Sequence, residues 1–178
     1  MRNVKTATMQ LIIINIICFV LTLGGTLFAN VLGNNYVYTV SHFQIYRLFT
    51  NLFYHFGFMH LLCNMFSLLQ IGMVIEYLYG KKQMLFCYFT TGILGSFISC
   101  IIHHILGHNV LSAGASGAIC GLLGVMLGSL NKFSNNKYQT IFLTLLPIIL
   151  IGFQGGVDNI AHWTCLFLGF GLSKFMKK

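Results

Sequence analysis

The chain has 178 residues, of which 57% are hydrophobic and only 7% are charged. Folding alone does not bury that much apolar surface, so an ordinary soluble domain is excluded and the lipid bilayer is the expected solvent. The formal net charge of +8 is divided among small clusters between apolar runs, and we therefore expect no nucleic-acid partner.

Six apolar runs predict an all-α polytopic membrane protein, a six-helix bundle that forms a single domain over residues 1–178. The expected spans are 9–28, 59–79, 84–105, 115–130, 138–154 and 159–176. The first run is long for a signal peptide and no convincing cleavage site follows it, so we expect a retained helix. The fourth run is short and is expected to start inside the membrane, and Pro147 is expected to kink the fifth.

The positive residues predict how these spans are oriented. With six spans, one side of the membrane receives nine of the ten cations: Arg2, Lys5, Lys81, Lys82, Lys132, Lys137, Lys174, Lys177 and Lys178. The positive-inside rule makes that side the cytoplasm, so both termini are expected there. No transit peptide is recognisable, which favours a bacterial cytoplasmic membrane.

The connection over residues 30–58 is rich in aromatic residues and too apolar for a simple solvated loop. Aromatic residues are enriched at the boundary between lipid and water, so we expect this segment to lie partly in the interface. It also contains Arg47, the one cation on the outer side.

Neither a metal nor an organic cofactor is expected. The six cysteines contain no CxxC pair and all fall inside apolar runs, which argues against a disulfide framework or a zinc site. His42, His103, His104 and His108 are expected at the outer surface rather than around a metal ion.

Four polar residues inside the apolar runs are predicted to lie at a similar depth. Helical rise puts Ser116 about 22 Å above Asn131 at the cytoplasmic end of its run, His162 about 18–22 Å above Lys174–Lys177 and Asn64 about 25 Å above Lys81, with His60 one turn higher. Polar groups at such depth are costly and usually functional. A serine nucleophile needs a base such as histidine, and Asn64, His60 and the free amide of Ser116 could bind an oxyanion.

Glycines recur at steps of three and four residues in the fourth run, at Gly117, Gly121, Gly124 and Gly128. The last run also contains two closely spaced glycines, Gly169 and Gly171. Such stripes permit close contact between helices, and by themselves they fit plain packing without chemistry equally well.

Taken together, these residues resemble the rhomboid family of intramembrane serine proteases. The principal shared elements are Gly114-Ala115-Ser116-Gly117, Ala161-His162, and His55, His60 and Asn64 in an HxxxxHxxxN pattern. Further matching elements are Tyr46-Arg47, Glu76, Gly80 and Val157-Asp158-Asn159. The resemblance covers nearly all of the chain beyond residue 40.

The resemblance implies a catalytic dyad of Ser116 as nucleophile and His162 as general base. It implies an oxyanion site made by His60, Asn64 and the Ser116 amide, with Gly114 beside them. Structural support is expected from His55, Gly117, Gly121, Glu76 and Arg47. The implied partners are transmembrane protein substrates and membrane lipids, and the implied site opens to the extracytoplasmic side.

Two residues depart from the family pattern. Cys120 stands where the family usually has an aromatic residue stacked on the histidine, and Cys165 stands where it usually has glycine. We expect a looser approach of the two helices and a less firmly oriented imidazole. Asp158 is four residues before His162 and is either a third catalytic member or, as we favour, a cap at the start of a helix.

Three functions remain open from the sequence. The first is an active intramembrane protease. The second is a catalytically inactive relative that binds membrane-protein clients. The third is a channel or transporter, supported only by six spans with polar groups at the midplane.

Overall fold

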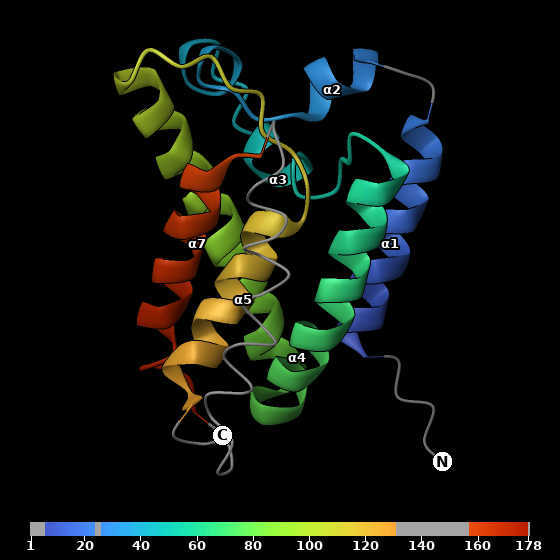
Figure 1. The fold of residues 1–178 in the computed structure, drawn as a ribbon, viewed down its shortest axis with the longest axis vertical. Coiled ribbons are helices and arrows are strands. Elements are labelled where there is room, and N and C mark those ends of the chain that lie inside the picture. The colour runs from blue at the N-terminus through green and yellow to red at the C-terminus, as the bar shows by residue number, and fades with distance from the viewer. Residues whose placement is uncertain (1–5, 24–25, 131–156, 178) are drawn as a thin grey trace.

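The computed structural model describes residues 6–23, 26–130 and 157–177, and this part of the chain is mostly helical. Four helices run along the long axis in Figure 1: α1 (Ala7–Thr22), α4 (Phe58–Ile105), α5 (Ser116–Gly128) and α7 (Asn159–Leu172). Three short helices gather at one end: α2 (Thr26–Leu32), the π-helix Val37–Ser41 and α3 (Arg47–Thr50). Within the described ranges, extended pairing is limited to one isolated antiparallel bridge.

Helix α4 consists of two arms that run in opposite directions (Figure 1). The reversal is at Gly80, where φ is 81° and ψ is 164°, a left-handed conformation that glycine adopts without a steric penalty. The arms coincide with the runs expected at 59–79 and 84–105. Among the described helices, α4 alone is long and apolar enough to cross a membrane, while α1 and α5 are apolar but shorter.

The first helix is shorter than the sequence suggested. We expected one span over 9–28, whereas α1 ends at Thr22 and α2 follows as a separate helix. The sequence between them contains Gly24-Gly25, and glycine is a poor helix former. The run expected at 138–154, with Pro147, lies outside the described residues, so the count of six spans stays a prediction.

Helix α5 occupies the centre of the bundle, between α4 and α7 (Figure 1). Its residues 118–126 are all buried. The large side chains that are almost fully buried come mainly from α4 and α5 and include Leu68, Ile75, Met84, Tyr88, Leu122, Leu123 and Val125. A helix buried on every side has little room for polar groups, so polar groups at its first turn are conspicuous.

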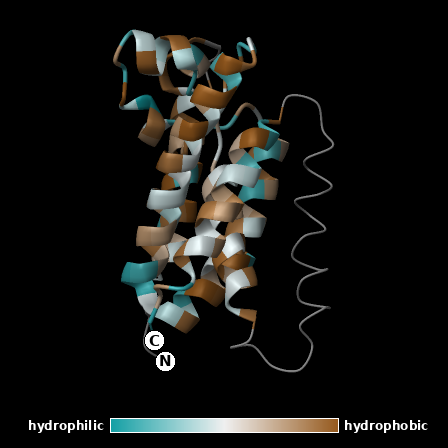
Figure 2. Cartoon of the chain, turned by 90° about the vertical axis from the view of Figure 1, so that its left-hand side faces the viewer, coloured by the Kyte–Doolittle hydropathy of each residue, from teal (hydrophilic) through white to brown (hydrophobic). Residues whose placement is uncertain are grey.

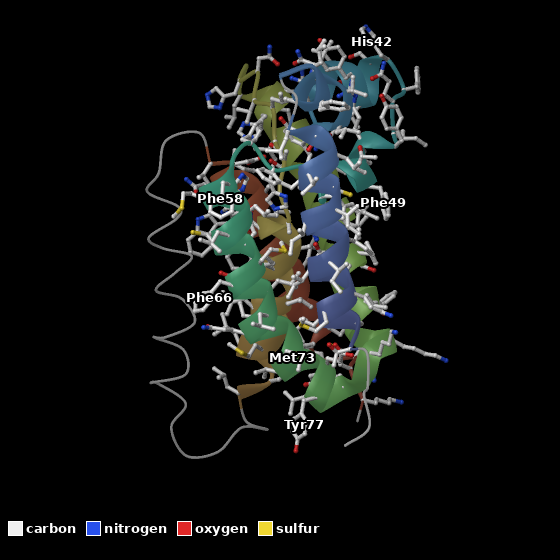
Figure 3. The ribbon with its side chains drawn as sticks, turned by 90° about the vertical axis from the view of Figure 1, so that its right-hand side faces the viewer. His42, Phe49, Phe58, Phe66, Met73 and Tyr77 are labelled. Atoms are coloured by element: carbon white, nitrogen blue, oxygen red, sulfur yellow. The ribbon has the colours of Figure 1, made fainter. Side chains whose placement is uncertain are left out.

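The first arm of α4 presents apolar side chains to the outside. Phe58, Phe66, Met73 and Tyr77 mark this side in Figure 3, and they are 64%, 58%, 39% and 89% exposed. Hydrophobic residues continue along the length of the helices in Figure 2. An exposed apolar surface of this extent is stable only in an apolar environment such as lipid.

The start of α1, the Gly80 bend and the end of α7 lie at the same end of the molecule (Figure 1). Nζ of Lys81 donates to Oε1 of Gln10 at 2.7 Å, and Nε2 of Gln83 donates to the carbonyl of Lys177 at 2.5 Å. Cations from distant parts of the sequence are therefore gathered at this end.

Candidate active site

Ser116 and His162 meet between α5 and α7. Oγ of Ser116 lies 2.7 Å from Nε2 of His162, and the histidine is only 8% exposed. Ser116 is the first residue of α5, and His162 lies in the first turn of α7. Because a helix start leaves its first amides without intrahelical acceptors, the Ser116 amide is available to an external group.

Glycines allow α5 and α7 to approach each other closely, and this close approach makes the contact between Ser116 and His162 possible. A Cβ on Gly124 would overlap the backbone carbonyl of Leu166, and a Cβ on Gly169 would overlap the backbone of Gly121. A Cβ on Gly121 would also overlap Thr91 of α4. The glycine stripe expected from the sequence therefore lies at the interface that brings Ser116 and His162 together.

Ser116 and His162 face a cavity of about 270 Å³ that is also lined by His60, Asn64 and Gly114. Gly114 has a φ of 118°, and a Cβ on it would lie 2.8 Å from Nε2 of His60 and 3.5 Å from Nδ2 of Asn64. Two side-chain donors and the first amide of α5 therefore surround one space beside the serine. That arrangement is able to hold an oxyanion.

Hydrogen bonds hold the segment that leads into Ser116. The amide of Gly114 donates to the carbonyl of Asn51 at 2.8 Å, and the amide of Ala115 donates to Nε2 of His55 at 3.4 Å. His55 is only 2% exposed, and burial, together with the nearby His60, lowers the pKa of His55 to about 3. The neutral ring is the form that can accept the Ala115 proton.

This geometry predicts an acid-sensitive fold. The unfolded chain protonates His55 below its ordinary pKa of about 6.5, whereas the folded chain resists protonation until about pH 3. The stability associated with neutral His55 is complete above pH 6.5 and is lost as the pH falls toward 3, at a cost of about 2 kcal/mol by pH 5. Thermal unfolding in detergent at pH 7.5 and pH 5 measures this loss.

The matched variant is His55→Gln, whose amide oxygen can accept a hydrogen bond but does not titrate in this range. Its melting temperature should depend less steeply on pH than that of the wild type. An equally steep dependence in the variant would show that other groups are responsible.

The other supporting residues lie away from the serine and histidine. Arg47 is buried in the outer segment, donates to the Gly33 carbonyl at 2.7 Å and lies 4.5 Å from the ring centroid of Tyr38. Glu76 accepts hydrogen bonds from the amides of Ala7 and Thr8 at 2.8 and 2.9 Å, at the start of α1. Both residues hold elements together at opposite ends of the bundle.

The two cysteines at unusual positions are accommodated by the packing. Cys165 donates from Sγ to the Thr91 carbonyl at 3.2 Å, and a Cβ on either Gly95 or Gly117 would meet its sulfur. Cys120 is buried. The 2.7 Å contact between serine and histidine is present with both thiols in place.

Trp163 does not substitute for the missing aromatic residue at position 120. It is 57% exposed, and its ring lies against Phe167 at a centroid distance of 6.2 Å. Nδ1 of His162 is buried and has no hydrogen-bond partner within the described ranges. Within these ranges, the hydrogen bond of the imidazole is the one that its Nε2 makes with Ser116.

Sequence reasoning missed the surroundings of Asp158. This residue caps α7, as we favoured, and it also receives hydrogen bonds from Ser99, His103 and Ser112. A signal was present, since the chain has only two acidic residues and a buried acid requires donors. In the part of the chain that the structure describes, no three His, Cys, Asp or Glu residues are arranged to hold a metal ion.

Comparison with known proteins gives a consistent result. The sequence model of the Rhomboid domain matches residues 42–178. The chain is 39% identical over 139 residues to "RHOMBOID-like protein 5" of Arabidopsis thaliana, an alignment that covers 75% of this chain and 44% of the relative. It is 34% identical over 138 residues to "Rhomboid protease GluP" of Bacillus subtilis (strain 168), covering 74% of this chain and 26% of the relative.

A third relative carries a different description. "Inactive RHOMBOID-like protein 8" of Arabidopsis thaliana is 32% identical over 130 residues, covering 70% of this chain and 36% of the relative. The chain spans less than half the length of each of these three relatives. Similarity of this extent is therefore shared with relatives of both descriptions.

Proposed function

The chain belongs to the rhomboid family, as its motifs predicted, and on that premise we propose that it is an intramembrane serine endopeptidase. Its substrates are membrane proteins, cut in or near their transmembrane segments. The observation that carries the proposal is the 2.7 Å contact between Oγ of Ser116 and Nε2 of His162 at the edge of a cavity. A nucleophile and its base require this proximity.

In the proposed reaction, Oγ of Ser116 attacks the carbonyl carbon of the substrate while its proton passes to Nε2 of His162. The developing oxyanion is stabilised by the Ser116 amide, Asn64 and His60, and the absence of a side chain on Gly114 leaves room for it. The imidazolium then returns its proton to the leaving amine. Water hydrolyses the acyl-enzyme by the same route, and no cofactor is needed.

Family membership makes the chain a multi-pass membrane protein. The proposed arrangement is one six-span domain over residues 1–178, with cytoplasmic termini, contacts with membrane lipids and a site that opens to the opposite side. It is supported by the cations gathered at the Gly80 bend and by the start of α5 (Figure 1), which lies nearer to the other end.

An inactive client-binding protein is the second candidate. It is favoured by the similarity to a relative described as inactive and by the two departures at Cys120 and Cys165. It is weakened by the presence of both Ser116 and His162 in mutual contact. A channel has no comparable support.

A serine-directed fluorophosphonate probe separates these candidates, because labelling requires an activated hydroxyl. The purified wild type should be labelled on the peptide that contains Ser116, as read by mass spectrometry, and His162→Gln should lose the label. Ser67→Ala is the control, since Ser67 lies on α4 and does not line the cavity, and it should be labelled like the wild type. A folded but unlabelled wild type would favour the inactive protein.

A further inference from the structure

The carboxylate of Asp158 joins three segments of the chain beside the proposed dyad. Its side chain is 8% exposed, and it accepts hydrogen bonds from Oγ of Ser99 at 2.8 Å and from Nε2 of His103 at 3.0 Å, both on α4. It also accepts hydrogen bonds from Oγ of Ser112, before α5, and from the Ala161 amide at 2.9 Å. One side chain thus clamps α4, the segment before α5 and the first turn of α7.

Both members of the dyad are a short distance along the chain from this clamp. His162 is one turn beyond Asp158, and its amide donates to the Asp158 carbonyl at 3.1 Å. Ser112 is four residues before Ser116, and its backbone exchanges two hydrogen bonds of 2.8 Å with Asn34. The clamp therefore sets where α7 begins relative to the segment that delivers the serine.

Asp158 is not a hydrogen-bonded third member of the dyad. Nδ1 of His162, the atom that such a member would contact, has no partner among the described residues. The hydrogen bonds of the carboxylate go instead to α4, to Ser112 and to the start of its own helix. Any influence of this carboxylate on the imidazole is therefore exerted through space.

Proton transfer from Ser116 to His162 creates a cation at a buried position. The amides at the start of α7 carry partial positive charge, which disfavours an imidazolium in the first turn. The chain has two acidic residues, and the other, Glu76, binds the start of α1 at the far end of the bundle. Asp158 is the acid positioned to offset this positive charge.

We propose that Asp158 is a positioning residue for the dyad, which clamps the start of α7 to the Ser112 segment and stabilises the imidazolium of His162 through space. This inference rests on the proposed peptidase function, because it presumes that His162 takes the proton of Ser116. It assigns the acid a role that needs its charge as well as its hydrogen bonds.

The carboxylate remains charged at neutral pH. Burial alone would raise the pKa of Asp158, but hydrogen bonds from Ser112, from the Ala161 amide, from His103 and from Ser99 outweigh burial and hold that pKa below its ordinary value. A negative charge is therefore present at the pH at which His162 would act.

Other titratable groups face this pair. His103 and Cys100 of α4 and Cys165 of α7 interact with Asp158, and His60 of α4 interacts with His162. The identity of each of these residues is unchanged when only residue 158 is substituted. A difference between wild type and a variant at this position consequently reports on the carboxylate.

The informative variant is Asp158→Asn, which is uncharged and caps helices about as well as aspartate. Its oxygen can accept from the Ala161 amide and His103, and its NH2 group can donate to the hydroxyls of Ser99 and Ser112, which are able to accept as well as donate. The pKa of the His162 imidazole should fall by about one unit. An NMR titration of histidine-labelled protein measures this, with the His162 signal identified by its absence in His162→Gln. In a cleavage assay, kcat should fall about tenfold at unchanged KM, and the acid limb of kcat/KM should move to lower pH.

Glu76→Gln is the matched control, since it removes the other carboxylate at the far end and should leave the His162 pKa unchanged. If Asp158→Asn does not fold, Asp158→Ser keeps a capping oxygen without the charge and permits the same titration. An unchanged His162 pKa overturns the inference even where the wild type cleaves its substrate. If the His162 pKa is lower in Asp158→Asn than in the wild type, but the wild type neither labels nor cleaves, the result supports the pairing of Asp158 and His162 and rejects the peptidase function.

Discussion

Replacing Ser116 with alanine should abolish cleavage of a transmembrane-segment substrate by purified protein in liposomes. The variant lacks the attacking oxygen that lies 2.7 Å from Nε2 of His162, so the rate should fall by about four orders of magnitude or more. His162→Ala should be similarly inactive. Because the two residues act as a unit, the double variant should be no slower than either single one.

Unfolding temperatures separate lost chemistry from lost structure in this series. Ser116→Ala removes one oxygen from the edge of a cavity and should melt close to the wild type. Cleavage that persists in purified Ser116→Ala at the wild-type rate would reject Ser116 as the nucleophile. Cleavage that persists only in His162→Ala would reject the proposed base.

The second large effect is expected from Gly124→Ala, far along α5 from the chemistry. The added methyl group would overlap the carbonyl oxygen of Leu166, which belongs to the backbone of α7 and has no rotamer with which to move away. The two helices must separate, and the contact between Ser116 and His162 lengthens. A misplacement of about 1 Å costs about a hundredfold in rate, and overpacking costs about 1–3 kcal/mol of stability.

Gly171→Ala is the matched control for this substitution. Gly171 is also helical, on α7, but an added Cβ would meet no atom within 4 Å. Alanine is the better helix former, so this variant should be as active and at least as stable as the wild type. Cleavage rates and melting temperatures of the two variants test the prediction, and wild-type activity in Gly124→Ala would contradict it.

Several features were predictable because their cause is local in the sequence. Ser116 and His162 stand out as polar residues inside apolar runs, where a bilayer makes polar groups costly. The bend at Gly80 lies where three residues, Gly80, Lys81 and Lys82, end one apolar run before the next begins. These properties follow from composition and spacing, which do not depend on how the helices pack.

Other features could not be predicted because they join residues that are distant in the chain. Ser99, His103 and Ser112 lie 59, 55 and 46 positions from Asp158, and each is an unremarkable polar residue in the sequence. Likewise, the pairing of the Ala115 amide with His55 spans 60 positions. Only the packing of α4 against α5 and α7 brings these groups within hydrogen-bond distance.

The sequence by itself determined that this protein is a helical membrane protein of the rhomboid family. The lengths of the apolar runs, the positions of the charges and the short motifs are properties of neighbouring residues in the chain. The tertiary structure alone decided how closely Ser116 approaches His162, and that Asp158 bonds α4 and Ser112 rather than the imidazole. The physical reason is that contact between helices depends on which small residues face each other. Here that means Gly121 and Gly124 against α7, a relation that exists only after the helices have packed.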